Sequence, residues 1–243
     1  MPRQLLAALV LAALLAGCAG PAGDGGGTAA LWVTRDRGAE VVLTATVPAG
    51  LTVLQALDRE ADVETRYGGR YVQAVNGIGG SLTGRRDWFY FLNGIEPDVG
   101  AAEVRLGPGD VAWWDFRSWA GEMEQPVVVG AFPEPFRHGW NGHARPVEVR
   151  GPPELAAERA ALADLLGVAG SGEPNRFLLV VRPGVRGATL TVRRGAANDS
   201  PVTFTLSGSL AAVRAAALAL AGDPSLVRYR YTARFDEEGR VIG

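Results

Sequence analysis

The sequence predicts an α+β fold in two domains, and three observations support this prediction. Residues 30–118 carry several β-rich runs and a single short helical segment. A second series of strands and helices follows from residue 123. The chain has 243 residues, of which 47 % are hydrophobic and 21 % charged, as expected for a globular protein of one large or two small domains.

The first domain is predicted to begin with a hairpin and a helix. Residues 30–35 and 40–47 are β-rich runs separated by a polar break, which is typical of a β-hairpin. After a Pro-Ala-Gly turn, Thr52 can cap a short helix that extends to Glu60, because the apolar residues of this segment fall on one helical face.

Three further strands are predicted in this domain, at residues 70–75, 87–92 and 111–116. An Asn-Gly pair follows each of the first two, at residues 76–77 and 93–94, and such pairs close tight turns. A hairpin, one helix and a return to strands is the element order of a β-grasp domain, which we place at residues 30–122.

The second domain, residues 123–243, is predicted to be a small antiparallel α+β domain of unknown role. Helices are expected over residues 154–166, ended by Gly167, and from Ser209 to residue 220, with Gly222 and Pro224 as stop signals. The expected strands are residues 126–131, 176–182, 187–193, 202–206 and 226–235. In the last run, apolar residues alternate with arginine or threonine, which is typical of a strand with one buried face.

Residues 1–18 have the pattern of a secretory signal. Arg3 precedes an apolar run over residues 5–15, which is shorter than the roughly 20 residues that cross a membrane. The sequence Leu-Ala-Gly-Cys that ends at Cys18 resembles the lipobox of bacterial lipoproteins, in which the cysteine receives a diacylglycerol. We therefore expect lipidation of Cys18, a flexible tether over residues 19–29, and a folded part outside the cytoplasm. The alternative is a plain signal peptide with an incidental cysteine.

Cys18 is the only cysteine, so the sequence excludes disulfides and thiolate metal sites. All 24 basic residues are arginine, and the formal net charge is −2, which gives no electrostatic reason to expect nucleic-acid binding. The usual motifs of hydrolases, metalloproteases and cysteine nucleophiles are missing. We therefore expect a protein that is not an enzyme.

Three stretches of the first domain resemble the transcobalamin-type carboxy-terminal domain. They are LTVLQAL from residue 51, YVQAVNG from residue 71, and WFYFLNG from residue 88, the last followed by GPGDV and a Trp-Trp pair. That family is a β-grasp module found in animal cobalamin carriers and in many bacterial lipoproteins. The resemblance covers about residues 30–118, and it implies a corrinoid such as cobalamin, or another small cofactor, as ligand. By the same resemblance, the candidate contacts are Tyr71, Asn76, Trp88, Tyr90 and Asn93.

The aromatic strands need two covering surfaces. Successive side chains of a strand point to opposite faces, so the Trp-Phe-Tyr-Phe run at residues 88–91 is apolar on both. The helix covers one face, and the second domain, a ligand or a partner covers the other. We expect the two halves to pack together, with the loop over residues 132–143 against the aromatic strands. Phe132, Phe136 and Trp140 would be covered there.

Two further clusters leave alternatives open. His138 and His143 could bind a transition metal or a corrin cobalt, with Glu134 and Asn141 as additional ligands. The alternative is a polar loop that packs Trp140. The arginines of residues 226–235 indicate a solvated strand face or contact with an anionic partner such as lipid headgroups.

The predicted function is therefore that of a lipid-anchored extracytoplasmic binding protein. It would capture a corrinoid or other small cofactor for delivery to a transporter. The alternative is a cell-surface interaction or structural module with no small-molecule ligand.

Overall fold

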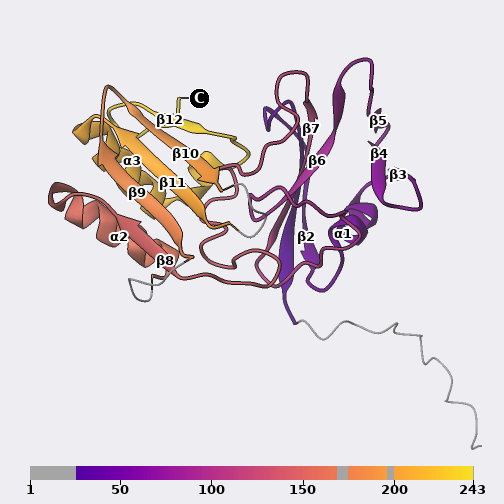
Figure 1. The fold of residues 1–243 in the computed structure, drawn as a ribbon, viewed down its shortest axis with the longest axis horizontal. Helices are drawn as coiled ribbons and strands as arrows, with labels where there is room; N and C mark the ends of the chain where they lie inside the picture. The colour runs from indigo at the N-terminus through magenta and orange to yellow at the C-terminus, as the bar shows by residue number, and fades with distance from the viewer. Residues whose placement is uncertain (1–25, 169–174, 196–199, 243) are drawn as a thin grey trace, which may run out of the picture.

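The computed structural model describes residues 26–168, 175–195 and 200–242. Cys18 and the predicted lipoprotein signal lie outside the described residues. Figure 1 shows two lobes, one formed by the N-terminal half of the described chain and one by the C-terminal half, and the α+β class is confirmed. No helix in the described part of the chain has the length and apolar character needed to cross a membrane.

The first domain has a four-stranded sheet in the order β2-β1-β7-β6. The central strands β1 and β7 are parallel, and the outer pairings are antiparallel. Helix α1 and a small sheet, β3-β4-β5, lie on one side of it, and the second domain lies on the other (Figure 1). The elements are β1 (Thr28–Arg35), β2 (Glu40–Pro48), α1 (Val53–Glu60), β3 (Val63–Arg66), β4 (Tyr71–Val75), β5 (Ile78–Gly79), β6 (Arg86–Leu92) and β7 (Val111–Ser118).

Local sequence signals explain how this domain starts and turns. The Thr52 hydroxyl accepts a hydrogen bond from the Gln55 backbone N–H, and the Gln55 side chain accepts one from the Thr52 N–H, which forms a capping box. Asn93 and Gly94 both have positive φ, as the predicted tight turn requires. Strand β3 was not predicted, because its sequence VETR is polar and largely exposed.

The second domain is a five-stranded sheet in the order β12-β10-β11-β9-β8, with two helices on one face. The sheet is mixed: β8 pairs with β9, and β9 with β11, in parallel, so the purely antiparallel arrangement was wrong. Helix α2 connects parallel neighbours β8 and β9, the usual helical crossover. The elements are β8 (Val147–Arg150), η1 (Pro153–Leu155), α2 (Ala156–Leu166), β9 (Phe177–Pro183), β10 (Ala188–Arg194), β11 (Val202–Gly208), α3 (Leu210–Gly222), η2 (Pro224–Val227) and β12 (Ala233–Phe235).

Two predicted strands of this domain were wrong. Residues 126–131 form no strand, and only Val127 makes an isolated bridge, to Ile95. Residues 226–235 contain the end of a 3₁₀ helix and only the three-residue strand β12. Between these two elements, Tyr229 adopts a positive φ of 64°, which a continuous strand does not allow.

These irregular segments join the two domains. Phe91 and Trp113, from the strand face opposite α1, pack with Val128, Ala131 and Tyr231 of the second half. Gly130 lies between strand β7 and the C-terminal segment. A Cβ at this position would stand 2.8 Å from the Trp113 ring and 2.5 Å from the backbone nitrogen of Arg230. The predicted packing of the two halves is therefore present.

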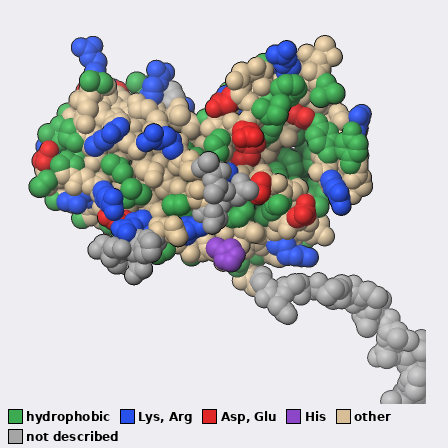
Figure 2. Space-filling model, viewed as in Figure 1, with side chains coloured by type: hydrophobic (Ala, Val, Ile, Leu, Met, Phe, Trp, Pro, Cys, Tyr) green, Lys and Arg blue, Asp and Glu red, His purple; other side chains and the backbone are tan. Residues whose placement is uncertain are grey.

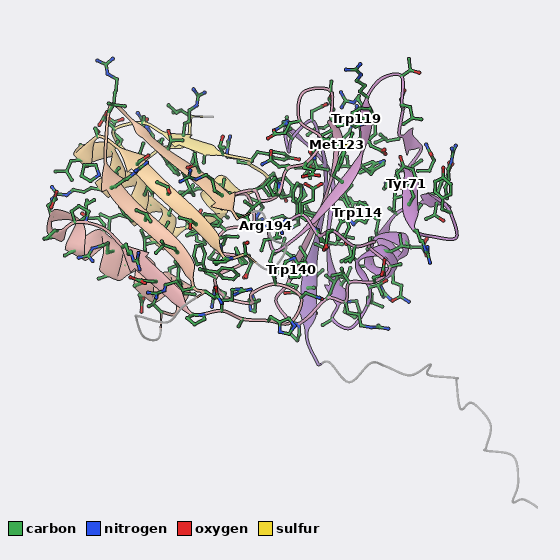
Figure 3. All side chains as sticks on the ribbon, viewed as in Figure 1. Tyr71, Trp114, Trp119, Met123, Trp140 and Arg194 are labelled. Atoms are coloured by element: carbon green, nitrogen blue, oxygen red, sulfur yellow. The ribbon has the colours of Figure 1, made fainter. Side chains whose placement is uncertain are left out.

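The loop that we expected at this contact lies elsewhere. Phe132 and Phe136 are buried, but their rings pack against Phe204 of the second sheet, at centroid distances of 6.0 and 4.9 Å. Trp140 contacts the cores of both domains and lies between the lobes in Figure 3. Residues 127–131 and 229–231 cover the aromatic strands instead.

Candidate ligand-binding cleft

An open cleft of about 460 Å³ lies at the outer edge of the first domain, between β4 and the start of β6. We call it the tyrosine cleft, after the two tyrosines in its wall. Figure 3 shows Tyr71 on the side of the first domain that faces away from the second. The lining residues are Arg66, Tyr67, Tyr71, Gln73, Gly80, Ser81, Leu82 and Asp87.

Tyr71 and Asp87 form an ordered polar pair in this cleft. The Tyr71 hydroxyl donates a hydrogen bond to the Asp87 carboxylate, whose other oxygen accepts one from the Trp88 backbone N–H at 2.9 Å. Burial, followed by the hydrogen bond to Asp87, raises the pKa of Tyr71 to about 12. Gly80 lets the loop approach this pair, since a Cβ there would stand 2.6 Å from an Asp87 oxygen. The phenol therefore stays protonated, with its proton directed to Asp87.

Two large apolar side chains flank the same cleft in solvent. Tyr67 is 80 % exposed and Leu82 is 83 % exposed. The Tyr67 ring lies 6.3 Å from the Tyr71 ring, at an interplanar angle of 63°. Exposed apolar side chains that gather around a hollow are typical of binding surfaces. The two tyrosines thus offer an aromatic corner beside a carboxylate.

Of the five predicted contacts, only Tyr71 lines the cleft. Trp88 is 6 % exposed, its Nε1–H donates to the Ile78 carbonyl at 2.8 Å, and its ring packs on Phe116 in the core. Asn76 is exposed at the hairpin turn, where its side-chain oxygen accepts from the Asp62 N–H at 2.9 Å. Both side chains have local structural roles.

Asn93 and Tyr90 are also held by the protein itself. Asn93 is fully buried; its amide donates to Asp110 at 2.7 Å and its oxygen accepts from the Val111 N–H at 2.8 Å. Tyr90 donates to the Val99 carbonyl at 2.7 Å, and its ring lies 5.1 Å from that of Trp114. Burial raises the pKa of Tyr90. These two residues fix a turn and a core layer, and neither lines the tyrosine cleft.

The histidine loop is organised by hydrogen bonds within the chain. His138 Nδ1 lies 2.6 Å from a Glu134 carboxylate oxygen, and the His138 backbone N–H donates to the other oxygen at 2.9 Å. Burial raises the pKa of Glu134. His143 and Trp140 pair through their backbones. In the residues that the structure describes, no group of three or more His, Cys, Asp or Glu side chains could hold a metal ion.

The first domain matches a known family model. Residues 50–118, less than half of the chain, match the model described as "Domain of unknown function (DUF4430)". The match runs from the start of α1 to the end of β7 and includes every residue that lines the tyrosine cleft. Its description names no transcobalamin-type family.

One similar solved structure is a Ruminococcus gnavus protein described as a "putative metal binding protein". The identity is 13 % and the TM-score 0.31, over 38 % of this chain and 97 % of the other. No curated protein matches the chain.

The segment that matches the family model contains cleft residues that the sequence did not predict. Tyr67 and Leu82 lie in loops outside the strands where aromatic contacts were sought. The only signals were a tyrosine beside two glycines, Gly68 and Gly69, and a leucine in a Gly-rich loop. A large apolar side chain in such a turn is seldom buried, because loops run over the surface. Its presence there therefore indicates a residue at the edge of a binding cleft.

Proposed function

We propose that this chain is a lipid-anchored extracytoplasmic binding protein that holds a small ligand in the tyrosine cleft. One observation carries the proposal: exposed Tyr67 and Leu82 flank a cleft whose wall contains the fixed Tyr71–Asp87 pair. The volume of about 460 Å³ falls within the range of small-molecule sites, about 300–1,000 Å³. Apolar walls with a few ordered polar groups are typical of such sites.

A ligand with a broad apolar face and hydrogen-bonding substituents fits this chemistry. The Tyr67 ring can contact the face. The Asp87 carboxylate, each of whose oxygens can accept a second hydrogen bond, and the Arg66 guanidinium can contact the substituents. A corrinoid has this character, and the resemblance to the transcobalamin-type module supports it. Because the cleft is open to solvent, it suits a protein that passes its ligand on to a transporter.

Titration calorimetry of the full chain with cobinamide and with cobalamin tests this proposal. We expect Tyr67→Ala to weaken binding by about 1–3 kcal/mol, as for loss of an aromatic anchor. Tyr67 makes no hydrogen bond through its side chain that the structure records, so this substitution spares the fold. Val185→Ala, at an 86 % exposed position in the second domain, is the matched control. Absence of heat with both probes would exclude corrinoids as ligands. If Tyr67→Ala bound the probes with the affinity of the unmodified chain, the tyrosine cleft would be excluded as the binding site.

The anchor has its own test. We expect acylation of Cys18, so Cys18→Ser should move the protein out of the membrane fraction or leave it unprocessed. The measurement is fractionation together with mass spectrometry of the mature N-terminus. A mature, unmodified N-terminus at any other residue would contradict the lipoprotein assignment.

A second candidate function is a cell-surface interaction module without a small ligand. It is favoured by the coverage of both faces of the aromatic strands, since Trp88 and Phe91 are buried within the chain. In that case the exposed Tyr67 would contact a protein. Calorimetry with corrinoids would then give no heat, and Tyr67→Ala would still abolish partner capture.

A further inference from the structure

The sheet of the second domain has one face that no helix covers. Helices α2 and α3 pack against the opposite face, and in Figure 1 they lie behind the strands. The burial of β11 alternates strictly: Val202, Phe204 and Leu206 are buried, and the residues between them are partly exposed. We call the side of the sheet that carries these partly exposed residues the open face.

Hydroxyl groups occupy the centre of the open face. Register places Thr205 opposite Thr191, and Ser207 opposite Thr189, on neighbouring strands β11 and β10. Thr203 lies two residues before Thr205, on the same side of the strand. Each hydroxyl can donate one hydrogen bond and accept two. On the other side of β11, Leu178 and Val180 of β9 lie opposite Thr203 and Thr205 and are partly exposed, so the face combines hydroxyls with two apolar side chains.

Three exposed arginines border these hydroxyls. Arg193 lies opposite Thr203, Arg182 opposite Ser207, and Arg234 opposite Thr189. Among the described residues, none of the three has an ion-pair or hydrogen-bond partner for its side chain.

The open face carries an excess of positive charge. Among the described residues of the five strands, the acid on this face is Glu148, which is already held by Arg150 and Arg176. Figure 2 shows arginines spread over this side of the second domain, whereas acidic side chains gather on the first. The chain as a whole has a net charge of −2, so this positive surface is a local arrangement.

We propose that the open face docks on the anionic phospholipid headgroups of a membrane. Guanidinium groups pair with phosphate through two parallel hydrogen bonds, and hydroxyls add donors between them. The three arginines lie on three different strands, so they can contact several headgroups at once, which fits a membrane surface better than one small molecule. The charge on the face is complementary to that plane.

The N-terminal segment favours a membrane over a dissolved polyanion. The apolar run at residues 5–15 is followed three residues later by Cys18, where the anchor is expected. The ten residues that follow, up to Thr28, can span at most about 35 Å when extended. A lipid at Cys18 would therefore hold the folded part of the chain, and the second domain with it, near the headgroups. This inference concerns a surface separate from the tyrosine cleft and does not depend on its ligand.

Vesicle co-sedimentation tests the proposal on the full chain carrying Cys18→Ala, which removes acylation. The quantity measured is the partition coefficient on phosphatidylcholine vesicles containing phosphatidylglycerol, divided by that on pure phosphatidylcholine. Any contribution of the apolar run at residues 5–15 is common to both. We expect a ratio well above one, decreasing with added salt, because each basic residue near an anionic surface contributes about fivefold.

We expect the ratio to fall about a hundredfold in the triple variant Arg182→Gln, Arg193→Gln and Arg234→Gln. Where the starting ratio is below a hundred, it should fall to one. The matched control changes three exposed arginines of the first domain, Arg59→Gln, Arg70→Gln and Arg85→Gln, with the same change in net charge. The control should keep the ratio. A ratio of one for the starting protein, or an equal loss in the control, would overturn the proposal. So would binding to soluble heparin without binding to the vesicles.

Discussion

Replacing Asp115 with alanine is expected to lower the free energy of unfolding by about 3–5 kcal/mol. Asp115 lies in β7 with no exposed surface and accepts four hydrogen bonds. Two come from hydroxyls, Thr34 at 2.7 Å and Tyr231 at 2.8 Å. Two come from the backbone N–H groups of Arg37 and Gly38, at 3.1 and 3.2 Å.

The magnitude follows from the donors that the substitution would leave behind. An unsatisfied buried donor costs about 1–3 kcal/mol. The Tyr231 hydroxyl is in the interior and cannot easily reach water, and the Thr34 hydroxyl would keep only a longer contact of 3.4 Å to the Trp114 carbonyl, whereas the two backbone groups are only partly buried. Most of the expected loss therefore comes from the two hydroxyls.

Urea unfolding of Asp115→Ala and Tyr231→Phe measures this effect. Tyr231→Phe removes a single donor and leaves Asp115 with three, so its loss should be about 1–1.5 kcal/mol. The two losses should differ clearly because Asp115 connects β7, the turn after β1 and the C-terminal segment. If Asp115→Ala unfolds at the same urea concentration as the unmodified chain, the network contributes nothing to stability.

The elements of the first domain were largely predictable because their signals are local. The Thr52 cap, the apolar face of α1 and the Asn93-Gly94 turn depend only on residues a few positions apart. The same holds for Ser209, which accepts from the Ala212 N–H and starts α3 as predicted. Strand β3 was not predicted because one valine followed by three polar residues contains no hydrophobic period.

The failures arise where a local pattern has a distant cause. Apolar and polar residues alternate over residues 226–235 because Tyr229 and Tyr231 both pack across the domain junction. The Tyr229 ring centroid lies 5.1 Å from that of Trp32, and the Tyr231 centroid 5.7 Å from that of Trp113. A strand and a junction segment give the same alternation, and only the partner surface distinguishes them. Likewise, Trp88 has the residue type of a ligand contact, yet the hairpin carbonyl of Ile78 satisfies its N–H.

A fragment that ends at Gln125 is expected to lose cooperative unfolding. It would lack residues 127–131 and 229–231, which cover Phe91 and Trp113 in the intact protein. Both side chains are fully buried, and burial of each contributes about 1.5–3 kcal/mol. Tyr231, which donates to Asp115, would be lost as well. The sum is comparable with the whole stability of a small domain, about 5–15 kcal/mol.

Calorimetry and ANS fluorescence of the fragment check this expectation, with the full chain measured alongside. We expect ANS emission to rise strongly and the melting transition to broaden or disappear. Gly130→Val in the full chain is a second test, because its side chain would meet the Trp113 ring and the Arg230 backbone while the second sheet stays intact. That variant should show a smaller rise in ANS emission and a lower melting temperature. A fragment that melts cooperatively at the temperature of the full chain would mean that the domains are independent, and the Trp113 face would then need another covering partner.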